Sequence, residues 1–128
     1  MTAAPENAFE LAVTLDDDGD AHITIAGDLD WETADELTDA ARVLLKAAPP
    51  PGRLRVDCGR MTLCDSLGLA SLLMIHRIAT ATGTRLQLEN RPTFLRRLLG
   101  MTGTVHLFAA LAAGHGAGPE DADAGGAR

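Results

Sequence analysis

Apolar side chains recur at every second position near the start of this chain, and then at every third or fourth position. Residues 9–15 have a large apolar side chain at each odd position, which is typical of a strand with one buried face. The Asp-Gly pair within residues 16–20 favours a turn, and residues 22–26 form a second strand-like run. These patterns predict a β-hairpin at the beginning of the fold.

After residue 30 the longer apolar period predicts a helix over about residues 32–47, and Thr33 and Glu36 have the spacing of a capping box. Strand and helix patterns then alternate along the rest of the chain. We expect a strand over 53–58, a loop over 59–64, a helix over 66–82 stopped by Gly83, a strand at 86–88, a helix beginning near 93, a fifth strand over 105–107 and one or two helical turns over 108–113.

The predicted order is β-β-α-β-α-β-α-β. A hairpin followed by strand-helix repeats indicates an α/β fold with a mixed sheet, in which the later strands run parallel and the helices pack mainly on one face. We expect one domain over residues 8–112, preceded by an extension over 1–7. Residues 113–128 contain Gly, Ala, Asp and Pro with almost no large apolar side chain, so we expect a disordered tail.

Charge and composition exclude several classes of function. The net charge is −7, and residues 1–40 hold 12 of the 18 acidic residues without any Lys or Arg. An acidic chain with only four aromatic residues lacks the basic surface and stacking platforms that nucleic acids need, and anionic membranes are disfavoured likewise. No stretch is typical of a secretory signal or a transmembrane helix. We therefore expect a cytoplasmic protein.

The motifs of common enzymes and cofactor sites are missing. The sequence contains no phosphate-binding glycine loop, no zinc-protease motif and no nucleophile elbow, and the histidines lack ligand spacing. Cys58 and Cys64 are separated by five residues, which matches neither a redox pair nor a zinc framework. We expect free thiols, no cofactor, no metal and no catalytic activity.

Both serines of the chain lie in one short segment, residues 65–71. Asp65 stands where a helix N-cap is expected, so Ser66 would be the first helical residue and would face outward. A phosphate on Ser66 would lie in the favourable field of a helix N-terminus. Ser71 lies about 140° further around the helix and should face the packed interior. The simpler interpretation is that Asp65 and Ser66 only cap the helix and Gly68 only allows close packing.

A family resemblance favours the functional interpretation. In order and spacing, the segments that carry it resemble the STAS domain, and within that superfamily the stand-alone bacterial anti-anti-sigma factors, over roughly residues 8–112. These segments are Gly27-Asp28-Leu29-Asp30, Thr33-Ala34-Asp35-Glu36-Leu37, Val56-Asp57-Cys58 and Cys64-Asp65-Ser66-Leu67-Gly68-Leu69.

This resemblance implies a partner switch. Such proteins bind an anti-sigma factor that is a serine kinase of the histidine-kinase-like ATPase fold, and so release a sigma factor. Phosphorylation of the serine breaks that complex and a serine phosphatase restores it. The resemblance implies Ser66 as phospho-acceptor. Leu67 stands where the family often has a small polar residue, which makes the contact surface more apolar. The implied partner-binding residues are Asp28, Asp30, Asp65, Ser66, Leu67 and Gly68.

Three alternatives remain open from the sequence. Residues 16–18 and Asp57 superficially resemble the acidic site of a response-regulator receiver, but no helix separates the first two strands and the only lysine is Lys46. A STAS module could instead be a fixed, unphosphorylated scaffold subunit of an ATPase or signalling complex. A thiol enzyme built on the two cysteines has no neighbouring His or Lys to lower a thiol pKa.

Overall fold

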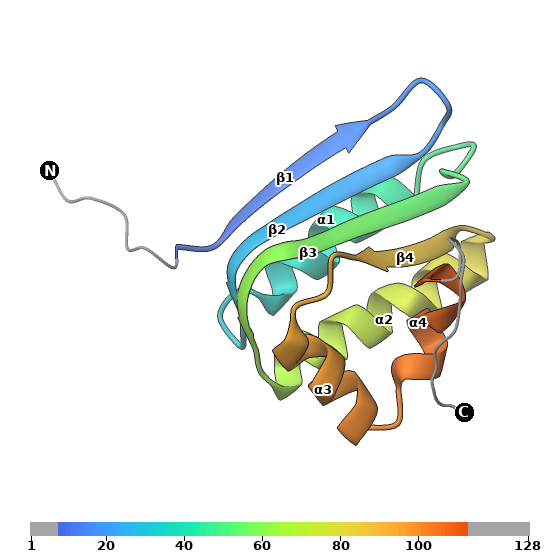
Figure 1. Ribbon diagram of the computed structural model, residues 1–128. Coiled ribbons are helices and arrows are strands. Elements are labelled where there is room, and N and C mark those ends of the chain that lie inside the picture. The colour runs from blue at the N-terminus through green and yellow to red at the C-terminus, as the bar shows by residue number, and fades with distance from the viewer. Residues whose placement is uncertain (1–7, 113–128) are drawn as a thin grey trace, which may run out of the picture.

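A four-stranded mixed sheet organises residues 8–112, the part of the chain that this computed structural model describes (Figure 1). Its strand order is β1-β2-β3-β4. β1 and β2 form the antiparallel hairpin, and β2, β3 and β4 run parallel to one another. The strands are β1 (Glu10–Leu15), β2 (Ala21–Leu29), β3 (Arg53–Cys64) and β4 (Arg85–Glu89).

The helices lie mainly on one face of this sheet, as Figure 1 shows for α1 and α2. Side chains along β2 alternate strictly between buried and partly exposed positions, which is the pattern of a strand with one covered face. This confirms the predicted mixed α/β fold with one covered face. The helices are α1 (Ala34–Leu45), α2 (Ser66–Thr82), α3 (Thr93–Met101) and α4 (Val105–Ala112).

Helix α2 lies in the centre of the helical layer. Its residues Leu72, Ile75 and Ala79 are fully buried at helical spacing, in one cluster with the inward side chains of the sheet. The helix ends at Gly83, whose φ of 78° is left-handed, as predicted for a glycine stop. This packing holds α2 against the sheet.

The predicted fifth strand is wrong: residues 105–107 begin helix α4. A strand would place the consecutive residues Leu107 and Phe108 on opposite faces, but Phe108 is fully buried in the core and Leu107 packs against the same core. The Phe108 ring packs edge-on against His76 of α2, with ring centroids 5.7 Å apart. Burial of this large ring outweighs the local β preference of Val105.

The central strands are longer than predicted, because β2 continues to Leu29 and β3 includes the expected loop 59–64. The register shifts between Thr24 and Ala26 and again at Gly27, so irregular pairing accommodates the glycines. The predicted capping box is also absent. Thr33 makes no side-chain capping bond, and its hydroxyl instead donates to the carbonyl oxygen of Asp28 at 2.8 Å.

The expected extension 1–7 and tail 113–128 lie outside the described residues. Across residues 8–112, no helix combines the length and the apolar character that crossing a bilayer requires.

Candidate partner-binding site at the start of α2

The Asp65 carboxylate joins three segments of the chain. Its Oδ1 accepts the backbone N–H of Gly68 at 2.8 Å, which is the predicted N-cap of α2. Its Oδ2 accepts the N–H of Trp31, in the loop between β2 and α1, at 3.1 Å. The N–H of Asp65 itself donates to the carbonyl of Leu29 at 3.2 Å. The loop after β2 is therefore held against the first turn of α2.

Ser66 is the first residue of α2 and is exposed. The other serine, Ser71, is buried, and its hydroxyl donates to the carbonyl of Gly68 at 2.6 Å. The structure thus separates the two serines as predicted. A kinase could reach the hydroxyl of Ser66 without unfolding α2, whereas Ser71 is part of the packing.

Gly68 is buried where α2 approaches β2 most closely. A Cβ atom on Gly68 would overlap the carbonyl oxygen of Leu29 and lie 3.0 Å from the carbonyl carbon. Only hydrogen fits this space. The structure therefore gives Gly68 a packing role, because a buried residue offers a partner no side-chain surface.

The two acidic residues at the end of β2 and just after it, Asp28 and Asp30, make hydrogen bonds to β3 and within the loop. Asp28 Oδ1 accepts the hydroxyl of Thr62 at 2.5 Å, across the β2–β3 pair. Asp30 Oδ1 accepts the N–H of Glu32 at 2.9 Å and thereby shapes the entry to α1. Neither carboxylate is bonded to Asp65. Their segment reaches the start of α2 through the backbone of Trp31 instead.

Three exposed apolar side chains lie on the segments that meet at the start of α2, and two of them were not identified from the sequence. Trp31 is 67% exposed, Leu67 is 53% exposed and Leu63, near the end of β3, is 43% exposed. We call Trp31, Leu63, Ser66 and Leu67 the Ser66 surface. Sequence analysis singled out only Leu67 among these apolar residues. The available signal for Trp31 was that the single tryptophan of the chain follows Asp30 in a loop.

The two cysteine thiols and the metal-ligating residue types give little support for other kinds of site. Burial raises the pKa of the Cys58 thiol to about 12, and burial followed by the Asp65 charge raises that of Cys64 to about 12. Both thiols are therefore protonated at neutral pH, which argues against the thiol-enzyme alternative. Within residues 8–112 no three metal-ligating side chains gather.

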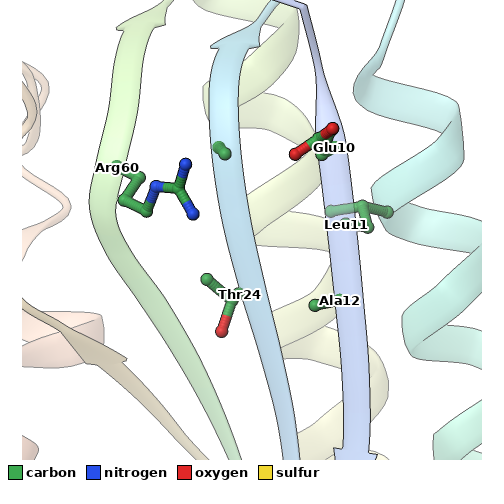
Figure 2. A pocket seen from close by; sticks show the side chains of 6 residues that line it. Glu10, Leu11, Ala12, Thr24 and Arg60 are labelled. Carbon is green, nitrogen blue, oxygen red and sulfur yellow. The ribbon is translucent and has the colours of Figure 1, made fainter.

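The open face of the sheet has one shallow depression, shown in Figure 2, of about 320 Å³. Arg60 of β3 extends toward β2 there, and Glu10 lies beyond β2 on β1. The depression lies on the sheet and not at the Ser66 surface. It is lined by Glu10, Leu11, Ala12, Thr24, Ala26 and Arg60.

Comparison with known proteins places the chain in a family. The family model described as "Mlab, STAS domain" matches residues 13–111. The chain therefore belongs to the STAS-domain family. A search of curated protein sequences finds no significant match.

Several solved structures share the fold. An anti-sigma factor antagonist from Mycobacterium paratuberculosis is 24% identical with a TM-score of 0.66, over 83% of this chain and 87% of that one. The phosphorylated form of the Bacillus cell fate determinant SpoIIAA is 19% identical with a TM-score of 0.62, over 79% and 88%. A sulfate transporter family protein from Wolinella succinogenes is 20% identical with a TM-score of 0.65, over 77% and 78%. At these identities the likeness establishes the fold.

Removal of the Asp65 carboxylate should destabilise the start of α2. We expect Asp65→Ala to lower the free energy of unfolding by about 1 to 2 kcal/mol, because the N–H groups of Gly68 and Trp31 lose their acceptors. Asp65→Asn keeps one acceptor oxygen and should cost less. Urea unfolding monitored by circular dichroism measures both changes. Equal stability of Asp65→Ala and the wild type would show that these bonds do not hold the site together.

Proposed function

We propose that this protein is an anti-sigma factor antagonist, a binding protein rather than an enzyme. It binds an anti-sigma factor with serine kinase activity through the Ser66 surface. Phosphorylation of Ser66 by that kinase ends the complex, a serine phosphatase restores it, and the exchange releases a sigma factor. Transcription is thereby regulated without direct contact between this protein and nucleic acid.

The observation that carries the proposal is the placement of Ser66. Its hydroxyl is exposed at the N-terminus of a long helix, where a phosphate finds a favourable field and leaves the helix intact. The Asp65 carboxylate and the exposed Leu67 are its neighbours in the chain, and the backbone of the exposed Trp31 is bonded to Asp65. Solved structures of an anti-sigma factor antagonist and of a phosphorylated cell fate determinant, both with the same fold, support this role.

The apolar character of this surface favours a protein partner. Aromatic and aliphatic side chains that are exposed in the free protein supply binding energy when a partner covers them. A phosphate added among them must lose water when the partner docks, and it also meets the Asp65 charge. Both effects weaken the complex selectively in the phosphorylated form.

The decisive experiment isolates the partner and assays its chemistry. We expect the unphosphorylated chain to retain an ATPase-fold kinase from a native cytosolic extract, and that kinase with ATP to add one phosphate to Ser66. Ser66→Ala should abolish the modification. Ser71→Ala is the matched control and should still be phosphorylated, because Ser71 is buried and the chain has only these two serines.

A second outcome would favour the scaffold alternative. The same fold occurs in a sulfate transporter family protein, so a STAS module need not be a sigma-factor regulator. If the retained partner is an ATPase subunit that leaves Ser66 unmodified and stays bound after incubation with ATP, the protein is a fixed subunit and the partner-switch proposal is wrong.

Trp31 should contribute to partner binding and little to folding. Because its side chain is 67% exposed, we expect Trp31→Ala to weaken the kinase complex at least tenfold and to change the free energy of unfolding by less than about 0.5 kcal/mol. The matched control is Val43→Ala on α1, a 72% exposed apolar residue outside the Ser66 surface. Isothermal titration calorimetry compares the two. Equal losses would place the partner elsewhere.

A further inference from the structure

The outer edge of β1 is unpaired within the described part of the chain. β1 is the last strand on its side of the sheet, whereas β4 at the other edge is accompanied by α4 (Figure 1). The N–H of Asp16 donates to the carbonyl of Asp20 at 3.0 Å, which continues the β1–β2 register. Because backbone groups alternate in direction along an antiparallel strand, the even-numbered residues bond to β2. The odd-numbered residues point their N–H and C=O groups outward.

The side chains at these odd positions are apolar and become more exposed along β1. Leu11 is partly buried, Val13 is 45% exposed and Leu15 is 70% exposed, all on the helix-covered face of the sheet. β1 has no Lys and no Pro and pairs with β2 without a bulge, and its one charged side chain, Glu10, lies on the opposite face from these apolar residues. Free backbone groups beside exposed apolar side chains form a template for another strand.

We infer that a second copy of this chain pairs with β1 in antiparallel orientation, about a two-fold axis at Ala12. In this register Leu11 lies opposite the partner's Val13, and Phe9 lies opposite the partner's Leu15. These outward-facing residues exchange their N–H···O bonds. The two sheets join into one, and both layers of helices lie on the same side. The pairing gives each copy what its edge lacks: backbone partners and apolar contacts for Val13 and Leu15.

Two criteria select this register: the face on which the apolar side chains lie, and the charges that would lie opposite one another. A shift by one residue would place the apolar side chains of one copy on the wrong face. A two-fold axis at Val13 would place Glu10 opposite the partner's Asp16, and like charges directly opposite one another are destabilising. An axis at Leu11 would leave Leu15 outside the paired strands. With the axis at Ala12, Glu10 faces the partner's Thr14 and every apolar residue has an apolar counterpart.

This inference goes beyond the proposed function and does not depend on it. The pairing uses β1, whereas the Ser66 surface lies at the start of α2 and in the loop after β2. A dimer of this kind would present two Ser66 surfaces. Loss of dimerisation and loss of kinase binding are therefore separable by experiment.

Cysteine cross-linking tests the register. At a non-hydrogen-bonded antiparallel pair the Cα atoms are about 4.5 Å apart, so Ala12→Cys should form an intermolecular disulfide under mild oxidation. Glu10→Cys lies on the same face of the same strand (Figure 2), but the two introduced thiols would be four residues apart along the paired strands, about 14 Å. We expect covalent dimer from Ala12→Cys alone, above a wild-type baseline that accounts for Cys58 and Cys64. Equal cross-linking of both variants, or none, overturns the inference.

Sedimentation equilibrium tests the pairing without cross-links. At concentrations on the order of 100 μM, in about 0.3 M sodium chloride to screen the net charge of −7, we expect the wild-type mass to approach twice 13.4 kDa. Val13→Pro removes an outward N–H and no bond to β2, so it should be a folded monomer. Val13→Thr keeps the branched shape and the N–H, and should still dimerise. A monomeric wild type, or a folded Val13→Pro dimer, overturns the inference.

Discussion

Gly68→Ala is expected to destabilise the protein by about 3 kcal/mol, at the upper end of the usual cost of overpacking. A Cβ atom at this position would overlap the carbonyl oxygen of Leu29, a backbone atom at the end of β2 that cannot rotate away. Leu29 also accepts the N–H of Asp65, so moving it to relieve the overlap would disturb the N-cap of α2. Urea unfolding should show a lower midpoint with an unchanged slope.

Gly100→Ala is the matched control, since Gly100 also lies inside a helix but has no atom within 4 Å of the position of a Cβ. There the substitution should stabilise the protein by about 0.5 to 1 kcal/mol, because alanine loses less conformational freedom in a helix. If both variants had the same stability, the close approach of α2 to Leu29 would not be a constraint on the fold. The predicted difference between the two glycines is about 4 kcal/mol in total.

The sequence correctly predicted those elements in which the local residue pattern and the tertiary packing favour the same structure. The alternating residues form strand β1 as predicted, although the face expected to be buried is exposed at Val13 and Leu15. Asp65 and Gly83 cap the two ends of α2 as expected. Ser71 is buried, as its angular position on the helix required. In each of these cases a short sequence pattern has one stable structural solution.

Sequence patterns gave wrong predictions where tertiary contacts determine the local structure. Residues 105–107 suit a strand by composition, but Leu107 and Phe108 both pack toward the core, which consecutive residues of a strand cannot do. The capping box offered the hydroxyl of Thr33 a local partner, yet this hydroxyl donates to the carbonyl of Asp28 near the end of β2. Neither competing contact is visible in a short sequence window, because each depends on how distant segments come together.

One part of the candidate site could also be predicted from the sequence, and another part could not. The position of Ser66 follows from one helix and could be read from the sequence, together with its exposure. The bond from Trp31 to Asp65 joins residues 34 positions apart and depends on the parallel alignment of β2 and β3. The sequence therefore pointed to the acidic residues Asp28 and Asp30, whereas the structure also places the exposed Trp31 at the start of α2.

Ser66→Asp is expected to weaken binding to the anti-sigma kinase at least tenfold, about 1.4 kcal/mol, and full phosphorylation about a hundredfold or more. The added charge must be desolvated as the partner covers the Ser66 surface, next to the Asp65 carboxylate. Ser66→Ala should bind like the wild type because it adds no charge. Titration calorimetry with the isolated kinase measures all three affinities.

Unfolding of the variant would not explain the lower affinity, because we expect Ser66→Asp to stay folded. An acidic residue in the first turn of a helix interacts favourably with the helix dipole, so Ser66→Asp should leave α2 as stable as in the wild type or slightly more so. Ser66→Asn is the matched control, since asparagine has the shape of aspartate without its charge. We expect Ser66→Asn to keep most of the affinity. If Ser66→Asp and Ser66→Asn bound the kinase equally, charge at Ser66 would not control the complex, and the partner switch would have to act through another residue.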